Sequence, residues 1–175
     1  NNFSDRSVIK KNISKKNKVL SKKLKKNILI ELSNNHNLRV NERSFKGVIN
    51  SREVKKNNIF FAIKGEKNDG NNYIKDAFRN GAQIVVGRKK IITHTKNYIK
   101  VKDPLKFLEE VSMINRETSD STFIGITGSC GKTSLKEMTK NAFQSFASIS
   151  ASKKSFNNKY GVPLSLFNFN DNDPY

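Results

Sequence analysis

The sequence predicts an α/β fold: a small α/β domain followed by the beginning of a P-loop-type parallel-sheet domain. Three observations support this. Apolar strand-like runs alternate with helix-like segments from about residue 44 onward, which favours parallel pairing. The run FIGITGSCGKTSLKEM (123–138) places a glycine turn between an apolar stretch and an amphipathic one. A change of composition at 117–121 (ETSDS) marks a domain boundary, and 175 residues suffice for one small domain and part of another.

The first domain is expected to contain four strands, at 44–50, 57–65, 83–87 and 98–101, because these runs are apolar and bounded by turn residues. One helix is expected within 72–82, where Tyr73, Ala77 and Phe78 recur at helical spacing and Gly81 stands at the C′ position. Another is expected at 103–117, where Asp103 is a typical N-cap and Pro104 a typical first residue. We expect residues 44–118 to close a core of their own.

The chain divides into three predicted parts. Residues 1–38 are read as a basic linker or the tail of an upstream domain, including the start of a Lys-rich helix. Residues 39–118 form the first domain. Residues 119–175 begin the second domain, with a strand at 122–127 and a helix at 132–143, and this domain is expected to be incomplete and unstable alone.

The glycine turn has the residues that a phosphate site needs. Gly128 and Gly131 allow the backbone to approach phosphate oxygens, and the helix that follows adds the partial positive charge of its N-terminus. Lys132 can reach the β- and γ-phosphates, and the Thr133 hydroxyl can bind Mg²⁺. The spacing is shorter than G-x-x-x-x-G-K-[ST]. The alternative is a structural strand-to-helix turn whose lysine is merely exposed.

The net charge of +19 raises the alternative of a nucleic-acid-binding module. However, residues 1–26 contain nine Lys and Arg6 against one acidic residue, Asp5, and so carry +9 of that charge. The distribution favours compositional bias and a solvated linker, with a functional basic arm as the alternative. The single cysteine, Cys130, excludes an internal disulfide. No apolar run approaches the roughly 20 residues of a membrane span.

Three ordered motifs resemble the Mur ligases, the cytoplasmic ATP-dependent amide-forming enzymes of peptidoglycan synthesis. TGSCGKTSLKEMT (127–139) resembles their short ATP loop, and KSFNNKYGVPLSLFNF (154–169) resembles their N-N-x-x-G-V-P-L segment. Residues 47–86 resemble their small N-terminal domain, which binds the UDP-sugar. Within the family, G-K-T-S-x-K-E-M with N-N-x-x-G-V-P is most similar to the D-alanyl-D-alanine-adding member.

The resemblance implies a reaction and its site residues. ATP would phosphorylate the terminal carboxylate of UDP-N-acetylmuramoyl-tripeptide, and the amine of D-Ala-D-Ala would attack the acyl phosphate. Lys132 and Thr133 would be catalytic, with Thr133 also holding Mg²⁺. Ser51, Arg52, Asn157 and Asn158 would bind substrate. ATP would be held by the whole loop: Gly128, Ser129, Cys130, Gly131, Lys132, Thr133 and Ser134.

Two positions depart from the family pattern: Asn50 replaces the acid of D-S-R, and Asn71 replaces the histidine of D-G-H. Both bear on the UDP-sugar contacts. The alternatives are a surface turn at 51–52 and a helix-capping loop at 157–158. A loop cysteine can be reactive, but the preferred interpretation of Cys130 is an ordinary loop residue without a chemical role. His36 and His94 lack partners at metal-ligand spacing and are assigned no role.

Further family features are expected after residue 175: a Mg²⁺-binding glutamate, a carbamoylated lysine and a C-terminal domain. This fragment alone is therefore expected to be inactive. Residues 1–13 are similar to the closing segment of the diaminopimelate- or lysine-adding Mur ligase. This similarity suggests the hypothesis that the parent protein is a fusion of two consecutive ligases. The rival functions are a sibling Mur ligase, a folate polyglutamate synthase-like ligase, and the basic nucleic-acid module.

Overall fold

The structure, a computed structural model, describes residues 46–91, 97–117, 119–153, 158–169 and 174. The predictions for the basic segment at 1–38 lie outside the described residues, as do those for His36, His94 and Asn157. In the part of the chain that is described, no helix is both long and apolar enough to cross a membrane.

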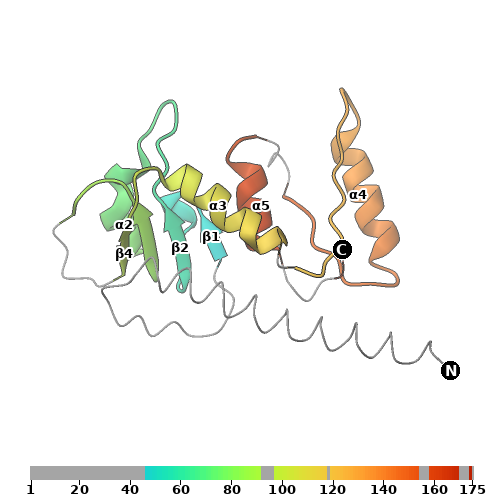
Figure 1. The fold of residues 1–175 in the computed structure, drawn as a ribbon, viewed down its shortest axis with the longest axis horizontal. Helices are drawn as coiled ribbons and strands as arrows, with labels where there is room; N and C mark the ends of the chain where they lie inside the picture. The colour runs from blue at the N-terminus through green and yellow to red at the C-terminus, as the bar shows by residue number, and fades with distance from the viewer. Residues whose placement is uncertain (1–45, 92–96, 118, 154–157, 170–173, 175) are drawn as a thin grey trace.

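A four-stranded parallel sheet forms the centre of the first domain (Figure 1). Its strands are β1 (Lys46–Val48), β2 (Asn58–Phe61), β3 (Ile84–Gly87) and β4 (Tyr98–Lys100), and they lie side by side in chain order with parallel pairing throughout. Every residue of β2 and β3 is buried. This continuous burial is typical of parallel strands that are covered on both faces, and it confirms the predicted α/β class.

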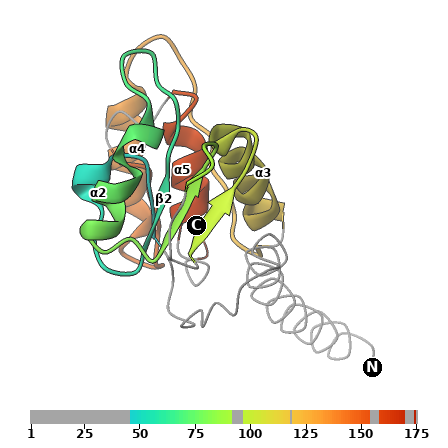
Figure 2. The same cartoon turned by 90° about the vertical axis from the view of Figure 1, so that its left-hand side faces the viewer.

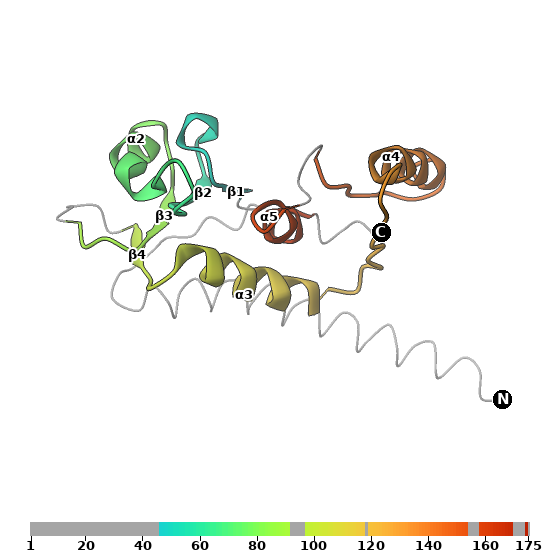
Figure 3. The same cartoon turned by 90° about the horizontal axis from the view of Figure 1, so that it is seen from above.

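Helical segments cover the two faces (Figures 2 and 3). One face carries η1 (Ser51–Glu53), η2 (Gly70–Tyr73) and α2 (Ile74–Arg79), and the other carries α3 (Pro104–Glu117). Successive strand residues point to opposite faces, so two apolar clusters form. The cluster on the α2 side consists of Val48, Val54, Phe60, Ala62, Ile74, Ala77, Ala82 and Val85. The cluster on the α3 side consists of Ile59, Phe61, Ile63, Ile84, Val86, Ile99, Phe107, Leu108, Val111 and Leu164.

The predicted ends of the two helices in this domain are confirmed. The Asp103 carboxylate accepts hydrogen bonds from the backbone N–H groups of Leu105 (2.9 Å) and Lys106 (3.3 Å), so Asp103 caps α3. Gly81 follows α2 with φ of +98°, the left-handed conformation that ends many helices.

The predicted strand at 122–127 is wrong: this segment is extended but is paired in no sheet among the described residues. The reason is that a strand exists only with a partner, and Thr122 donates one isolated hydrogen bond to the carbonyl of Pro174 (2.8 Å) instead. The helix after the glycine turn, α4 (Lys132–Phe143), has the predicted bounds. None of its side chains is buried, and Leu135 and Met138 are more than half exposed.

A further helix, α5 (Gly161–Asn168), was not predicted, and it packs against α3 and β1. Leu164 from this helix is 4% exposed and belongs to the apolar cluster on the α3 side. One side chain of the core that residues 44–118 were expected to close therefore comes from the second predicted domain. Figures 1 and 3 show α5 between the sheet and α4.

Candidate nucleotide and substrate site

The turn at 128–131 adopts the backbone conformation that its glycines predicted. Gly128 has φ of +151° and Gly131 has φ of +74°, and Gly131 directly precedes the first residue of α4. At Gly131 this is the left-handed conformation, which side chains with a Cβ disfavour. A Cβ at Gly131 would meet no atom within 4 Å. Space is therefore open beside Gly131.

The N-terminus of α4 presents unused backbone donors. Among the described residues, the N–H groups of 129–134 find no hydrogen-bond acceptor, and the first bond of the helix runs from Leu135 N–H to the carbonyl of Gly131 (2.9 Å). Free N–H groups at the start of a twelve-residue helix attract anions, and the helix dipole adds to this attraction. This arrangement fits the phosphates of a nucleotide.

Lys132 lies over the turn. Its ammonium group donates to the carbonyl of Gly128 and to the carbonyl of Ser129 (3.2 Å). The side chain thus satisfies carbonyls of the loop itself. These bonds lie at an exposed site, so exchanging them for phosphate oxygens involves a small change in free energy.

Thr133 and Cys130 are both exposed. A hydroxyl at this position can supply one oxygen ligand to a magnesium ion whose remaining ligands are phosphate oxygens and water, which is the usual pattern for Mg²⁺ with nucleotides. The described residues include no group of three or more His, Cys, Asp or Glu that could hold a metal by itself. Thr133 therefore fits a Mg²⁺ that arrives with its nucleotide.

Ser51 and Arg52 belong to the turn η1, which begins three residues after the end of β1. Ser51 is buried, and its carbonyl accepts a hydrogen bond from the side-chain amide of Asn80 (2.9 Å). Arg52 is exposed. The side chain of Asn50 accepts from the N–H of Arg52 (3.1 Å) and so caps the turn. Asparagine caps as well as aspartate does, so the exchange of the family's acid for Asn50 preserves the local geometry.

Asn71, the second departure, is buried and bonded on all sides. Its side-chain nitrogen donates to the carbonyl of Ala62 (2.9 Å) and to the carboxylate of Asp69 (2.8 Å). Its side-chain oxygen accepts from the N–H groups of Arg88 (2.9 Å) and Lys89 (3.4 Å). Asn71 therefore ties the loop before α2 to the ends of β2 and β3.

Asp69 is held ionised in the same network. Burial by itself raises the pKa of its carboxyl group. The hydrogen bonds from the side chains of Asn71 and Arg88 outweigh that effect, with a further contribution from the Asn71 N–H, and they hold the pKa well below its usual range. The Arg88 guanidinium lies 2.6 Å from the Asp69 carboxylate.

Asn158 acts as a cap in the structure. Its side-chain oxygen accepts from the N–H groups of Tyr160 (3.1 Å) and Gly161 (2.8 Å), at the start of α5. This is the geometry of the helix-capping alternative for the Asn-Asn segment. The described contacts bring neither Asn158 nor the turn at 51–52 together with the loop at 128–134.

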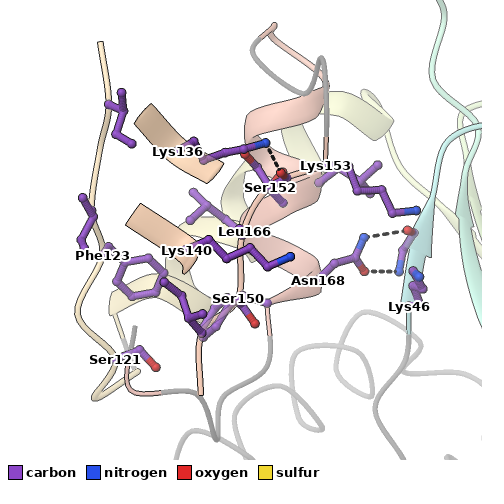
Figure 4. A pocket seen from close by; sticks show the side chains of 18 of the residues that line it. Lys46, Ser121, Phe123, Lys136, Lys140, Ser150, Ser152, Lys153, Leu166 and Asn168 are labelled. Atoms are coloured by element: carbon purple, nitrogen blue, oxygen red, sulfur yellow. Dashed lines mark hydrogen bonds between the residues drawn. The ribbon is translucent and has the colours of Figure 1, made fainter. Parts of the chain in front are cut away.

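A cleft of about 520 Å³ separates the α4 side of the molecule from β1 and α5 (Figure 4). None of the loop residues 128–134 lines it, so it is distinct from the candidate phosphate site. Asn50 lies at one wall. The charged residues along its lining are four lysines and one acid: Lys46, Lys136, Lys140, Lys153 and Glu53.

Comparison with known proteins assigns the family. The family model described as "Mur ligase family, catalytic domain" matches residues 48–114. The chain is 38% identical over 147 residues to the UDP-N-acetylmuramoyl-tripeptide–D-alanyl-D-alanine ligase of Rickettsia prowazekii, covering 83% of this chain and 31% of that protein. The chain belongs to the Mur ligase family. The Mur ligase resemblance read from three motifs is thereby confirmed.

This Mur ligase chain is also similar to a solved structure and to a second ligase sequence. It superposes on the crystal structure of the MurF ligase from Thermotoga maritima in complex with ADP with a TM-score of 0.64 and 30% identity, over 75% of this chain and 30% of that one. It is also 38% identical over 94 residues to the UDP-N-acetylmuramoyl-L-alanyl-D-glutamate–2,6-diaminopimelate ligase of Rickettsia prowazekii, covering 54% of this chain and 20% of that protein. The chain thus spans about a third or less of the length of these relatives.

Sequence reasoning identified Asn50 and Asn71 as departures from the family pattern but missed their structural roles. The cap formed by Asn50 is local, two residues from its donor, whereas the network around Asn71 joins Ala62 and Arg88 at the ends of β2 and β3. The two substitutions could have indicated these roles, because an asparagine in place of the family's acid or histidine keeps the capacity for hydrogen bonds without a charge. Asn168, at the end of α5, had no signal beyond its place in an apolar run.

Proposed function

We propose that this chain is part of an ATP-dependent, ADP-forming carboxylate–amine ligase of peptidoglycan precursor synthesis in the cytoplasm. The reaction is the addition of D-Ala-D-Ala to UDP-N-acetylmuramoyl-tripeptide. One observation carries this proposal: the open glycine turn with free N–H groups and Lys132 at the start of α4, in a chain 38% identical over 147 residues to a ligase of that name.

The roles of the loop residues follow from their positions. The N–H groups of 129–134 and the Lys132 ammonium surround the phosphates of ATP, and Lys132 exchanges the carbonyls of Gly128 and Ser129 for phosphate oxygens. Thr133 donates an oxygen ligand to Mg²⁺. When bound, Mg²⁺ neutralises the charge that builds up on the transferring phosphoryl group.

The substrate chemistry balances in two steps. The terminal carboxylate oxygen of the tripeptide attacks the γ-phosphorus of ATP, the bond to the β-bridging oxygen breaks, and ADP leaves. The amine of D-Ala-D-Ala then attacks the acyl carbon, loses a proton and expels phosphate. Such transfer relies on positioning and charge neutralisation, which is what a loop without a side-chain nucleophile provides.

The UDP end of the substrate is assigned to residues 39–118. Arg52 is exposed on the turn after β1, and a guanidinium there can pair with a diphosphate through two parallel hydrogen bonds. Ser51 is buried within that turn, and the motif resemblance assigns Asn157 and Asn158 to substrate binding. Residues 119–175 begin the ATP-binding domain, and residues 1–38 are a basic linker or the tail of a preceding domain. The similarity of residues 1–13 to the end of the preceding ligase supports a fusion, which sequencing the upstream gene would test.

The second candidate is a sibling Mur ligase, favoured by the 38% identity over 94 residues to the diaminopimelate ligase. The test is to assay the full-length enzyme for ADP release with each pair of substrates. We expect sustained ADP release with UDP-N-acetylmuramoyl-tripeptide and D-Ala-D-Ala together. Without the tripeptide no ADP should form, and without D-Ala-D-Ala at most one ADP per enzyme should form, because the acyl phosphate is made before the amine attacks. Release with UDP-N-acetylmuramoyl-L-alanyl-D-glutamate and diaminopimelate instead would assign the chain to the sibling.

A further inference from the structure

The last residue of α5 is clamped to the edge of the sheet. The side-chain oxygen of Asn168 accepts from the N–H of Gly47 (2.7 Å), and its side-chain nitrogen donates to the carbonyl of Gly47 (2.9 Å), across 121 residues of sequence (Figure 4). Gly47 is the middle residue of β1, the edge strand of the sheet. An edge strand has unpaired backbone groups. One primary amide here supplies the donor and the acceptor that a neighbouring strand would supply.

The close approach of α5 to β1 requires glycine at position 47. A Cβ on Gly47 would lie 2.7 Å from the ring of Phe167, which is closer than side-chain atoms approach one another. The same Phe167 ring packs edge-on against Phe61 with centroids 5.2 Å apart. The contact between the helix end and the strand is therefore built from both sides.

Two buried polar side chains of α3 hold the other side of α5. The Ser112 hydroxyl lies 2.7 Å from the carbonyl of Pro163, and the Asn115 amide donates to the carbonyl of Leu166 (2.7 Å). Both residues are nearly fully buried. The Leu166 carbonyl lies in the last turn of the helix, where no intrahelical donor is available. The helix α5 is consequently fixed against α3 and β1 along its length.

Both ends of α5 adjoin a candidate substrate segment. Asn158 caps its first turn, and the clamped Gly47 lies three residues before Asn50, which caps the turn containing Ser51 and Arg52. An eight-residue helix is about 12 Å long at 1.5 Å per residue. A helix held at both ends sets the distance between the two segments.

We propose that Asn168 is a positioning residue that, through α5, fixes the spacing between Asn158 and the turn at 50–52. The ligand that needs this spacing is long, with a nucleoside diphosphate at one end and a peptide carboxylate at the other. The inference rests on the proposed function. Asn168 itself touches no reacting atom, and it acts through Gly47 and the helix.

The test compares two variants of Asn168 with a control in the full-length ligase. Asn168→Ala removes both hydrogen bonds. Asn168→Asp keeps the acceptor for the Gly47 N–H but places an oxygen against the Gly47 carbonyl. Asn141→Ala, an exposed asparagine of α4, is the matched control. The readouts are KM for each substrate, kcat, and hydrogen–deuterium exchange of the peptide spanning 46–50.

We expect both Asn168 variants to raise KM for UDP-N-acetylmuramoyl-tripeptide about tenfold, while KM for ATP and kcat change by less than about twofold. Exchange at 46–50 should become about tenfold faster, because the Gly47 N–H loses its acceptor or its geometry. The control should match the wild type. Asn168→Asp keeps the test open if Asn168→Ala folds poorly.

Three outcomes would overturn the proposal. Unchanged exchange at 46–50 would refute the clamp. Faster exchange with an unchanged KM, or an equal decline of every kinetic parameter with a lower Tm, would reduce Asn168 to a structural role. A wild-type enzyme that forms no amide would refute the proposed function, and the positioning role with it, and the exchange data would still report on the clamp separately.

Discussion

Replacing Leu164 by alanine should destabilise the first domain, although Leu164 lies beyond its predicted boundary. The side chain is 4% exposed and belongs to the same apolar cluster as Phe61 and Leu108. Truncating a buried leucine to alanine costs about 2–5 kcal/mol, from the lost transfer free energy and the cavity that remains. Leu135 on α4 offers a matched control because the same change is made on a side chain that is 52% exposed. There the cost should stay within about 0.5 kcal/mol.

The assay is urea unfolding of the 175-residue chain, monitored by tyrosine fluorescence and by circular dichroism. We expect the transition of Leu164→Ala to shift to clearly lower urea with an unchanged slope, and that of Leu135→Ala to overlay the parent. Equal midpoints for the two variants would refute the packing of α5 on the sheet. That result would restore a first domain that ends near residue 118.

Three further predictions follow from charged residues. Lys132→Ala in the full-length enzyme should lower the ligation rate at least about a hundredfold, because it removes charge stabilisation in the transition state, and the circular dichroism spectrum should not change. The control is Lys106→Ala, on the exposed side of α3, which should keep wild-type activity. Ligation by Lys132→Ala at the wild-type rate would show that Lys132 has no part in the mechanism. The depressed pKa of Asp69 means that its stabilising effect is complete above its unfolded pKa of about 3.9 and is lost as pH falls toward the lower folded value. Asp69→Asn should therefore lower the free energy of unfolding by about 1–2 kcal/mol at pH 7 and flatten its decline below about pH 4, as urea midpoints at pH 7 and 3 would report. Deleting residues 1–26 should leave ligation unchanged, and any DNA affinity of the intact protein should fall steeply with salt; tight, sequence-selective DNA binding at physiological salt would instead favour a functional basic arm.

The local features of this fold could be predicted from the sequence because they depend on neighbours in the chain. The apolar runs around Phe60 and Val85 are the two fully buried strands. The caps at Asp103 and Gly81 depend on the backbone within a few residues of each. The bounds of α4 and the left-handed Gly131 before it follow from a glycine turn that precedes an amphipathic run.

The sequence also located the candidate phosphate loop, since that site is built almost entirely from consecutive residues. Free N–H groups, two glycines and Lys132 come from one glycine turn at the start of α4, so their arrangement needs no distant segment. The substrate side differs. Ser51 and Asn158 were found only through motif resemblance, and their surroundings in the fold were not predicted.

Only the tertiary structure decided the features that join distant segments. Whether 122–127 is a strand depends on a hydrogen-bonded partner, and apolar composition carries no information about one. The roles of Asn71 and Asn168 are set by backbone groups 9 to 121 residues away. An amide can bond equally well to water, to a ligand or to a strand edge. The sequence alone determined the four strands of the first domain, the caps at Asp103 and Gly81 and the candidate phosphate loop of this Mur ligase chain, and long-range packing determined which helix completes its core.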